Sequence, residues 1–127
     1  MIKNKENEID IEQRCIDGIQ KCVDESTNYG VSKGLDRETA QRLTKRMMED
    51  ITQAIVIDMN NLADNSNIAD PYANTNVAIN NIANAISFYG IDKNIAQNMA
   101  QMIADAMANA MIQFTQQMQQ INNYYNS

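Results

Sequence analysis

The sequence predicts an all-α protein, a four-helix bundle built from two tandem αα-hairpins. One Pro and four Gly in 127 residues leave long stretches without a helix breaker. In those stretches apolar residues recur three and four positions apart, which is typical of amphipathic helices. A composition of 44% hydrophobic and 20% charged residues fits one globular domain over 1–127. We expect repeat one over about 6–64, repeat two over about 70–122 and a C-terminal tail over 116–127.

The first expected helix runs from about Glu6 to Thr27 and ends at Tyr29-Gly30. Its apolar stripe is Cys15, Ile16, Ile19, Cys22, Val23 and Ser26. Seven helical residues separate the Cα atoms of the two cysteines by roughly 10 Å, and a disulfide needs less than about 7 Å. We therefore expect both cysteines to be reduced core residues in a reducing compartment.

The second expected helix starts at Asp36, whose side chain is a good N-cap. Leu35 and Ala40 flank this cap as a hydrophobic staple. The core stripe is Ala40, Leu43, Met47, Ile51, Ala54, Ile55 and Leu62. The polar run Asp64-Asn65-Ser66-Asn67 then ends the helix and divides the halves.

The third expected helix takes Asp70 as its N-cap and Pro71 as its first residue, where Pro loses no hydrogen bond. It runs to about Phe88, and a second Tyr-Gly pair, Tyr89-Gly90, ends it. Its apolar side is Ile79, Ile82, Ala83, Ile86 and Tyr89.

The halves match each other along the chain. Leu35 and Asp36 correspond to Ile91 and Asp92 at a separation of 56 positions, whereas the Tyr-Gly pairs lie 60 apart, so we place a four-residue insertion near 31–34. This pattern predicts an internal duplication of a hairpin. The alternative is two independent hairpins that solve the same capping problem alike.

The fourth expected helix begins at Asp92 and runs to about Asn122. Its polar residues Gln97, Gln101, Asp105, Asn109 and Gln113 form one narrow strip, and between Met99 and Phe114 most of the circumference is apolar. Such a helix is either the centre of its own bundle or covered by other subunits. The residues predicted for a protein interface are Met99, Met102, Met107, Met111, Phe114, Met118, Tyr124 and Tyr125. The Gln- and Asn-rich tail is either a frayed end or a segment that docks Tyr124 and Tyr125 on a neighbour.

Charge and composition argue against several functions. With 10 Lys+Arg against 16 Asp+Glu the net charge is -6, so the overall field of the chain repels nucleic acid and argues against it as a partner. The absence of His removes the commonest general base and metal ligand, and no Gly-rich phosphate loop or nucleophile motif occurs. No stretch has the ~20 apolar residues of a membrane span. We expect no enzyme activity, no cofactor, no metal and no small-molecule ligand.

A basic patch of Arg37, Arg42, Lys45 and Arg46 faintly resembles a helix-turn-helix DNA reader. Glu38, Glu49 and Asp50 lie on the same expected helix. The alternative is therefore a solvated face with Glu–Arg and Asp–Arg pairs.

The leading hypothesis is a non-catalytic, self-associating structural protein whose partner is itself or a larger assembly. The abundance of Asn, Lys and Ile hints at an AT-rich genome, and we expect a phage or viral accessory protein in the host cytoplasm or the virion. The alternative is an acidic regulator or inhibitor of a host protein, of the anti-defence type. Its recognition would rest on the first helix and on Glu6, Glu8, Asp10, Glu12 and Asp17.

Overall fold

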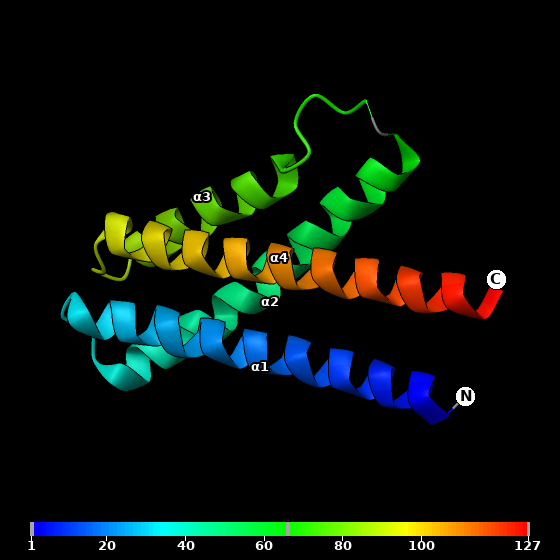
Figure 1. Cartoon of the computed structure of the whole chain (residues 1–127). Coiled ribbons are helices and arrows are strands. Elements are labelled where there is room, and N and C mark those ends of the chain that lie inside the picture. Colours follow the sequence, from blue (N-terminus) through cyan, green and yellow to red (C-terminus); the bar gives the residue numbers. More distant parts are fainter. Residues whose placement is uncertain (1, 66, 127) are drawn as a thin grey trace.

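The computed structural model describes the backbone of residues 2–65 and 67–126, and the side chains of residue 10 and of residues 12–65 and 67–126. This part of the chain folds into four helices, α1 (Ile2–Ser32), α2 (Arg37–Asp64), α3 (Ala73–Ser87) and α4 (Lys93–Asn126) (Figure 1). The helices pack against one another, so the predicted all-α four-helix bundle is confirmed.

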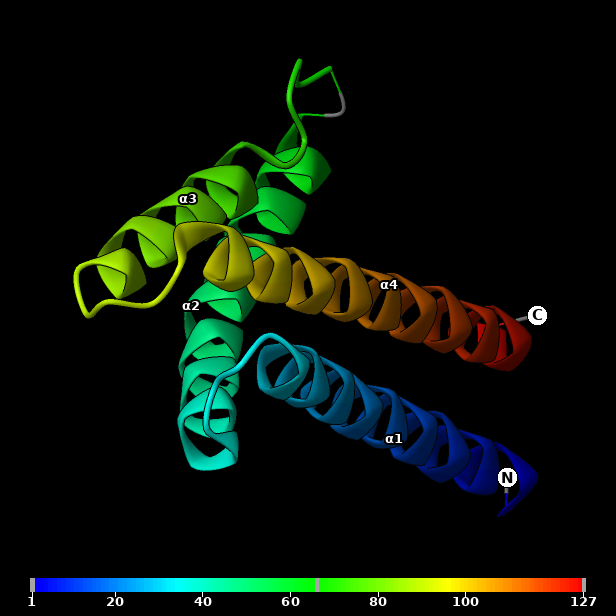
Figure 2. The same ribbon diagram turned by 90° about the vertical axis from the view of Figure 1, so that its left-hand side faces the viewer.

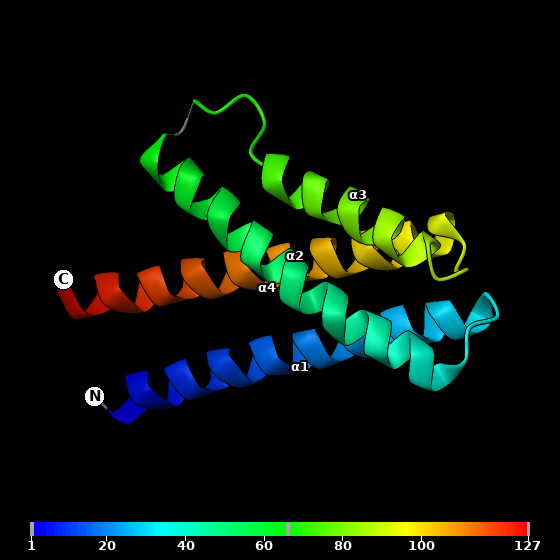
Figure 3. The ribbon, with the colours of Figure 1, turned by 180° about the vertical axis from the view of Figure 1, so that it is seen from behind.

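The arrangement centres on the crossing of α2 and α4. These two helices contact each other, and each of them also contacts α1 and α3. In the described part of the chain the backbones of α1 and α3 make no contact with each other. α1 and α4 lie antiparallel and side by side, and α2 runs steeply across them (Figures 2 and 3). The first half of α1 and the second half of α4 thus continue past α2 as a two-helix arm.

The core lies at this crossing. Its largest fully buried apolar side chains are Met47 and Ile51 from α2, and Met99 and Ile103 from α4. The outer helices add Cys22 from α1 and Ile79 and Ala83 from α3. Burying one large apolar side chain contributes roughly 1.5–3 kcal/mol, so this cluster is the main stabilising element of the bundle.

The end of α1 corrects the sequence prediction. The helix does not stop at Tyr29-Gly30 but continues to Ser32. Gly30 is a buried helical residue, whereas Gly34 has the positive φ of 103° that ends a helix. The amide of Leu35 bonds back to the carbonyl of Gly30 at 3.0 Å and closes this turn.

The two hairpin turns also correct the expected insertion. Gly90 has a φ of 86° and precedes Ile91-Asp92, just as Gly34 precedes Leu35-Asp36. The first turn, 33–36, has four residues and the second, 88–92, has five, so the first turn holds no four-residue insertion, and the separation of 56 positions holds from the turn glycine onward. The match of the two Tyr-Gly pairs at 60 positions compared Gly30, which is helical, with Gly90, which lies in a turn.

The caps of α2 and α4 follow the prediction, and that of α3 does not. Asp36 accepts a hydrogen bond from the Thr39 amide at 3.3 Å, and Asp92 accepts one from the Asn94 amide at 2.7 Å. Asp70 accepts instead from the amide of Tyr72 at 3.0 Å, in a turn before α3 starts at Ala73. Asp70-Pro71 is therefore not the start of α3. The first amides of α3 donate hydrogen bonds to the carboxylate of Asp58 on α2 instead.

Some residues of the expected apolar stripes lie outside the core. Ile16 is 58% exposed because it belongs to the two-helix arm, where α4 alone covers α1. Leu62 is 42% exposed in the last turns of α2, and Tyr89 is 87% exposed in the turn after α3. α4 is longer than expected and reaches Asn126, so the tail over 116–126 is helical and not frayed.

Thr27 carries a buried hydroxyl without a hydrogen-bond partner among the residues described. The change Thr27→Val removes this hydroxyl at nearly constant shape, and we expect it to raise the free energy of unfolding by about 1 kcal/mol. Urea denaturation followed by circular dichroism measures the effect. Thr44→Val is the matched control, because the Thr44 hydroxyl bonds that of Ser26 at 3.1 Å and its loss should destabilise the protein. A Thr27→Val protein less stable than the wild type would contradict this account.

Candidate functional site

The predicted interface residues of α4 divide into three groups. Met99 and Met107 are buried in the core of this chain, so no partner can reach them in this fold. Met102, Met111, Phe114 and Met118 are half-buried, and Tyr124 and Tyr125 are exposed. α4 contacts all three other helices, so its first half is surrounded by its own bundle. The apolar character of that half is thereby explained without a second subunit.

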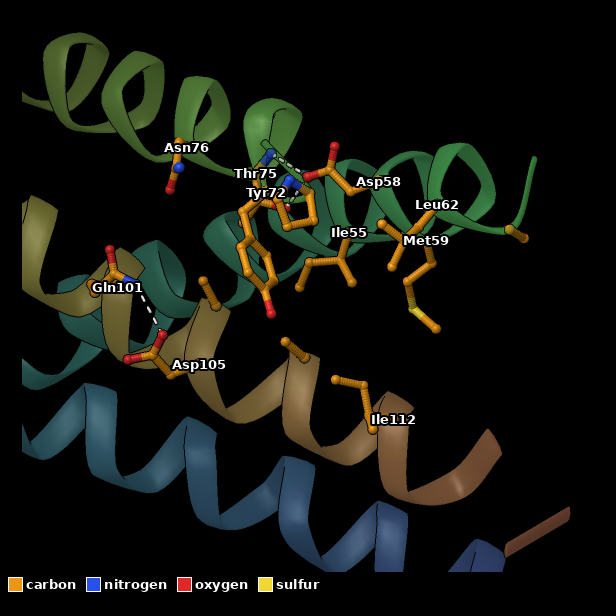
Figure 4. A pocket seen from close by; sticks show the side chains of 14 residues that line it. Ile55, Asp58, Met59, Leu62, Tyr72, Thr75, Asn76, Gln101, Asp105 and Ile112 are labelled. Carbon is orange, nitrogen blue, oxygen red and sulfur yellow. Dashed lines mark hydrogen bonds between the residues drawn. The ribbon is translucent and has the colours of Figure 1, made fainter. Parts of the chain in front are cut away.

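An apolar groove lies where the end of α2 and the middle of α4 diverge beneath the start of α3. Its volume is about 490 Å³, within the range of roughly 300–1,000 Å³ found for ligand sites. Side chains that line it include Ile55, Met59 and Leu62 of α2, Tyr72 and Thr75 at the start of α3, and Ala104, Asp105, Ala108 and Ile112 of α4 (Figure 4). Tyr72 extends from α3 across the groove toward α4.

Asp58 of α2 holds the start of α3 at the inner edge of this groove. Its Oδ1 accepts hydrogen bonds from the amide and side-chain nitrogens of Asn74 at 3.0 and 2.8 Å. Its Oδ2 accepts from the amide and hydroxyl of Thr75 at 2.8 and 2.7 Å. The carboxylate thus replaces the missing N-cap of α3.

The environment of Asp58 shifts its pKa. Burial alone would raise the pKa, but the four hydrogen bonds from Asn74 and Thr75 favour the charged form more strongly, so the pKa lies below its ordinary value. Sequence analysis missed this residue. The available signal was an Asp three positions after Ile55, on the apolar side of the expected helix.

The charges around the groove are all negative. Of its lining residues, Asp58 and Asp105 are acidic and none is Lys or Arg. Asp105 is exposed and accepts a hydrogen bond from Gln101 at 2.9 Å on the α4 wall (Figure 4). The groove therefore combines an apolar floor with an acidic wall.

Two aromatic residues form a second apolar surface in the α3–α4 turn. Phe88 and Tyr89 are each 87% exposed, more than the other large hydrophobic side chains described. This aromatic turn lies at one extremity of the molecule (Figure 2). It is at the opposite end of α3 from the groove. The prediction that Tyr89 lies on the apolar side of the third helix is wrong, because α3 ends at Ser87 and Tyr89 lies in the turn beyond it.

A smaller hollow of about 260 Å³ lies between α1 and α4 in the arm, near Cys15 and Gly18. Both cysteines are free. Cys22 is buried in the core as predicted, but Cys15 is half-buried and lies outside the core. Burial raises the pKa of the Cys22 thiol, and the carboxylate of Glu25 adds to the rise. The Cys22 thiol is therefore protonated at neutral pH and is a poor nucleophile.

Two of the four basic residues in the α2 patch form the predicted ion pairs. Arg42 contacts Glu38 at 2.6 Å and Arg46 contacts Asp50 at 3.7 Å, all with exposed side chains. Exposed pairs of this kind contribute about 0–1 kcal/mol each. The face resembles a solvated helix surface more than a phosphate-binding one.

The fold and these surfaces define a four-helix protein with an apolar, acid-walled groove at one end of α3 and an aromatic turn at the other. Among the described side chains, no three His, Cys, Asp or Glu lie together as a metal site requires. Over the same part of the chain, no helix is both long and apolar enough to cross a membrane. No protein-family model, curated protein or solved structure matches the chain.

Proposed function

We propose that this chain is a non-catalytic, self-associating structural protein. The observation that carries the proposal is its large accessible surface of 8488 Å². A compact monomer of 14.3 kDa exposes about 6,800 Å², so the excess is roughly 1,700 Å². One stable interface takes about 800 Å² from each partner. In size, this excess of accessible surface equals two such interfaces.

Three groups of exposed large apolar side chains support the proposal. Leu62 and Ile112 flank the groove, Phe88 and Tyr89 form the aromatic turn, and Tyr124 and Tyr125 end the arm. From the predicted interface we retain the residues beyond the core, which are Met102, Met111, Phe114, Met118, Tyr124 and Tyr125. An accessory role in a virion or in the host cytoplasm is part of this proposal and rests on composition.

The proposal is tested by the mass of the protein in solution. Light scattering or native mass spectrometry over the micromolar range should show oligomers whose mass increases with concentration. Ile112→Asp in the groove should reduce the oligomer to a monomer, because it buries a charge in an apolar contact. Val77→Asp is the control, since Val77 is 57% exposed on α3 away from the groove. A wild-type protein that stays monomeric throughout would refute self-association.

The alternative function is an acidic inhibitor of a host protein. The exposed carboxylates Asp10, Glu12 and Asp17 on α1 favour it, and the side chains of Glu6 and Glu8 lie outside the described residues. Two of these three already have local partners, because Asp10 pairs with Arg14 and Asp17 accepts from Gln13. Binding through such charges should slow steeply with added salt, whereas association through an apolar contact should not.

The duplication of the hairpin is also part of our proposal. Ala40 and Met47 of α2 are fully buried, and so are Ala96 and Ile103, which lie 56 positions later in α4. The contacts support it too: α1 packs on α2 and α4, and α3 packs on the same two helices.

A further inference from the structure

We propose that copies of this chain assemble head to tail, with the aromatic turn of one copy inserted into the groove of the next. This inference rests on the self-association proposed above and assigns two contact surfaces to it in addition to the retained residues of α4. It requires a second copy as the occupant of the groove.

The positions of the two surfaces exclude filling of the groove from within one copy. The groove lies at the start of α3, near Tyr72 and Thr75, and Phe88 follows the end of this helix. The 15 residues of α3 span about 22 Å. A surface and its complement at opposite ends of one molecule produce a heterologous contact, which gives either a closed ring or an open filament.

The chemistry of the two surfaces is complementary. Ile55, Met59 and Leu62 offer an apolar wall to the rings of Phe88 and Tyr89. Tyrosine combines a large apolar ring with a polar tip, so the hydroxyl of Tyr89 can remain near the polar wall of Gln101 and Asp105. Aromatic anchors that fill a partner's pocket supply much of the binding energy of protein interfaces.

The charges of the two surfaces are complementary as well. Lys93 lies four residues after Tyr89 and is the one Lys or Arg in the sequence after Arg46. The groove carries Asp105 and Asp58, and no cation lines it. Asp92 beside Lys93 keeps its negative charge while it accepts from the amide of Asn94, and the positive end of the α4 dipole offsets that charge. A contact between turn and groove therefore brings a cation toward an acidic wall.

The surface area also fits two contacts for each chain. The excess of roughly 1,700 Å² corresponds to two patches of about 800 Å², and a head-to-tail assembly uses one patch on each side of every copy. The two aromatic side chains can bury roughly 150–250 Å² each, about half of one such patch. The surrounding residues of the turn and of the groove rim would supply the remainder.

Complementation between two variants tests the inference. The turn variant Phe88→Ala/Tyr89→Ala keeps an intact groove, and the groove variant Ile112→Asp keeps an intact turn. Each variant alone should be monomeric with wild-type helicity by circular dichroism. Mixed in equal amounts, they should form a heterodimer that does not grow further, because a single complementary pair of surfaces remains. Native mass spectrometry resolves the two chains by mass.

Two results would overturn the inference and leave self-association standing. One is that the turn variant alone has the same mass distribution as wild type. The other is that wild type self-associates but the mixture of the two variants stays monomeric. A wild-type monomer would instead refute the proposed function itself. Val77→Asp should assemble like wild type. If Val77→Asp lost assembly as completely as Ile112→Asp, the assignment of the groove would also be refuted.

Discussion

Replacing Asp58 with Ala is expected to lower the free energy of unfolding by about 3 kcal/mol. The carboxylate accepts four hydrogen bonds from Asn74 and Thr75. Its removal leaves two amides at the start of α3 without an acceptor, and the side chain of Thr75 is buried as well. Without this cap the start of α3 is no longer held on α2, so the first turn of α3 should lose protection from hydrogen exchange first.

The stabilisation by Asp58 should also depend on pH. Because folding lowers its pKa, the contribution is fully present above the ordinary value of 3.8 and is lost as the pH falls through the lower folded-state pKa. Urea denaturation of wild type and Asp58→Ala should therefore give free energies of unfolding that differ fully at pH 7 and approach each other only as the pH falls below 3.8 through the folded-state pKa. Asp50→Ala is the control, because that carboxylate makes only an exposed pair with Arg46. An equal loss of stability in both variants at pH 7 would contradict the role of Asp58.

Gly30→Val should lower the free energy of unfolding by about 2 kcal/mol. A Cβ atom at Gly30 would lie 3.2 Å from the Ala40 Cβ, the Leu35 Cδ1 and the Met99 Sδ. These atoms belong to three parts of the chain that meet at the first hairpin, so the extra methyl groups of Val must push α1 away from α2 and α4. Thermal unfolding followed by circular dichroism measures the loss.

Gly18→Ala is the matched control in the same helix. No atom lies within 4 Å of a Cβ at Gly18 outside its local backbone, so Ala fits there without strain. Since Ala is the better helix former, this change should raise stability by about 0.5–1 kcal/mol. If Gly30→Val proved as stable as Gly18→Ala, the close packing at Gly30 would be wrong.

Most of the fold could be predicted from local pattern. The spacing of Met47, Ile51, Met99 and Ile103 places them on the inner faces of two helices, and all four are fully buried. Asp36 and Asp92 were predictable caps because capping needs only neighbouring residues. The limits of α1 and α3 were not predictable, since Gly30 and Asp58 act through contacts with other helices.

The candidate site was predictable only in part. The apolar and Met-rich character of α4 was visible in the sequence, but burial of Met99 and Met107 in the chain's own core was not. The groove joins residues from α2, α3 and α4 that are up to 57 positions apart, from Ile55 to Ile112. Its shape depends on the angle at which α2 and α4 diverge, and side-chain periodicity carries no information on that angle.

The sequence by itself determined four amphipathic helices, their order, two of their caps and the unequal distribution of charge, because each depends on residues within a few positions of one another. Only the tertiary structure decided which apolar residues are covered. Helices of this length can cross at several angles, and the crossing of α2 with α4 buries Met99 while it leaves Leu62, Ile112 and the aromatic turn exposed. The surfaces available to a partner are those that this crossing leaves uncovered.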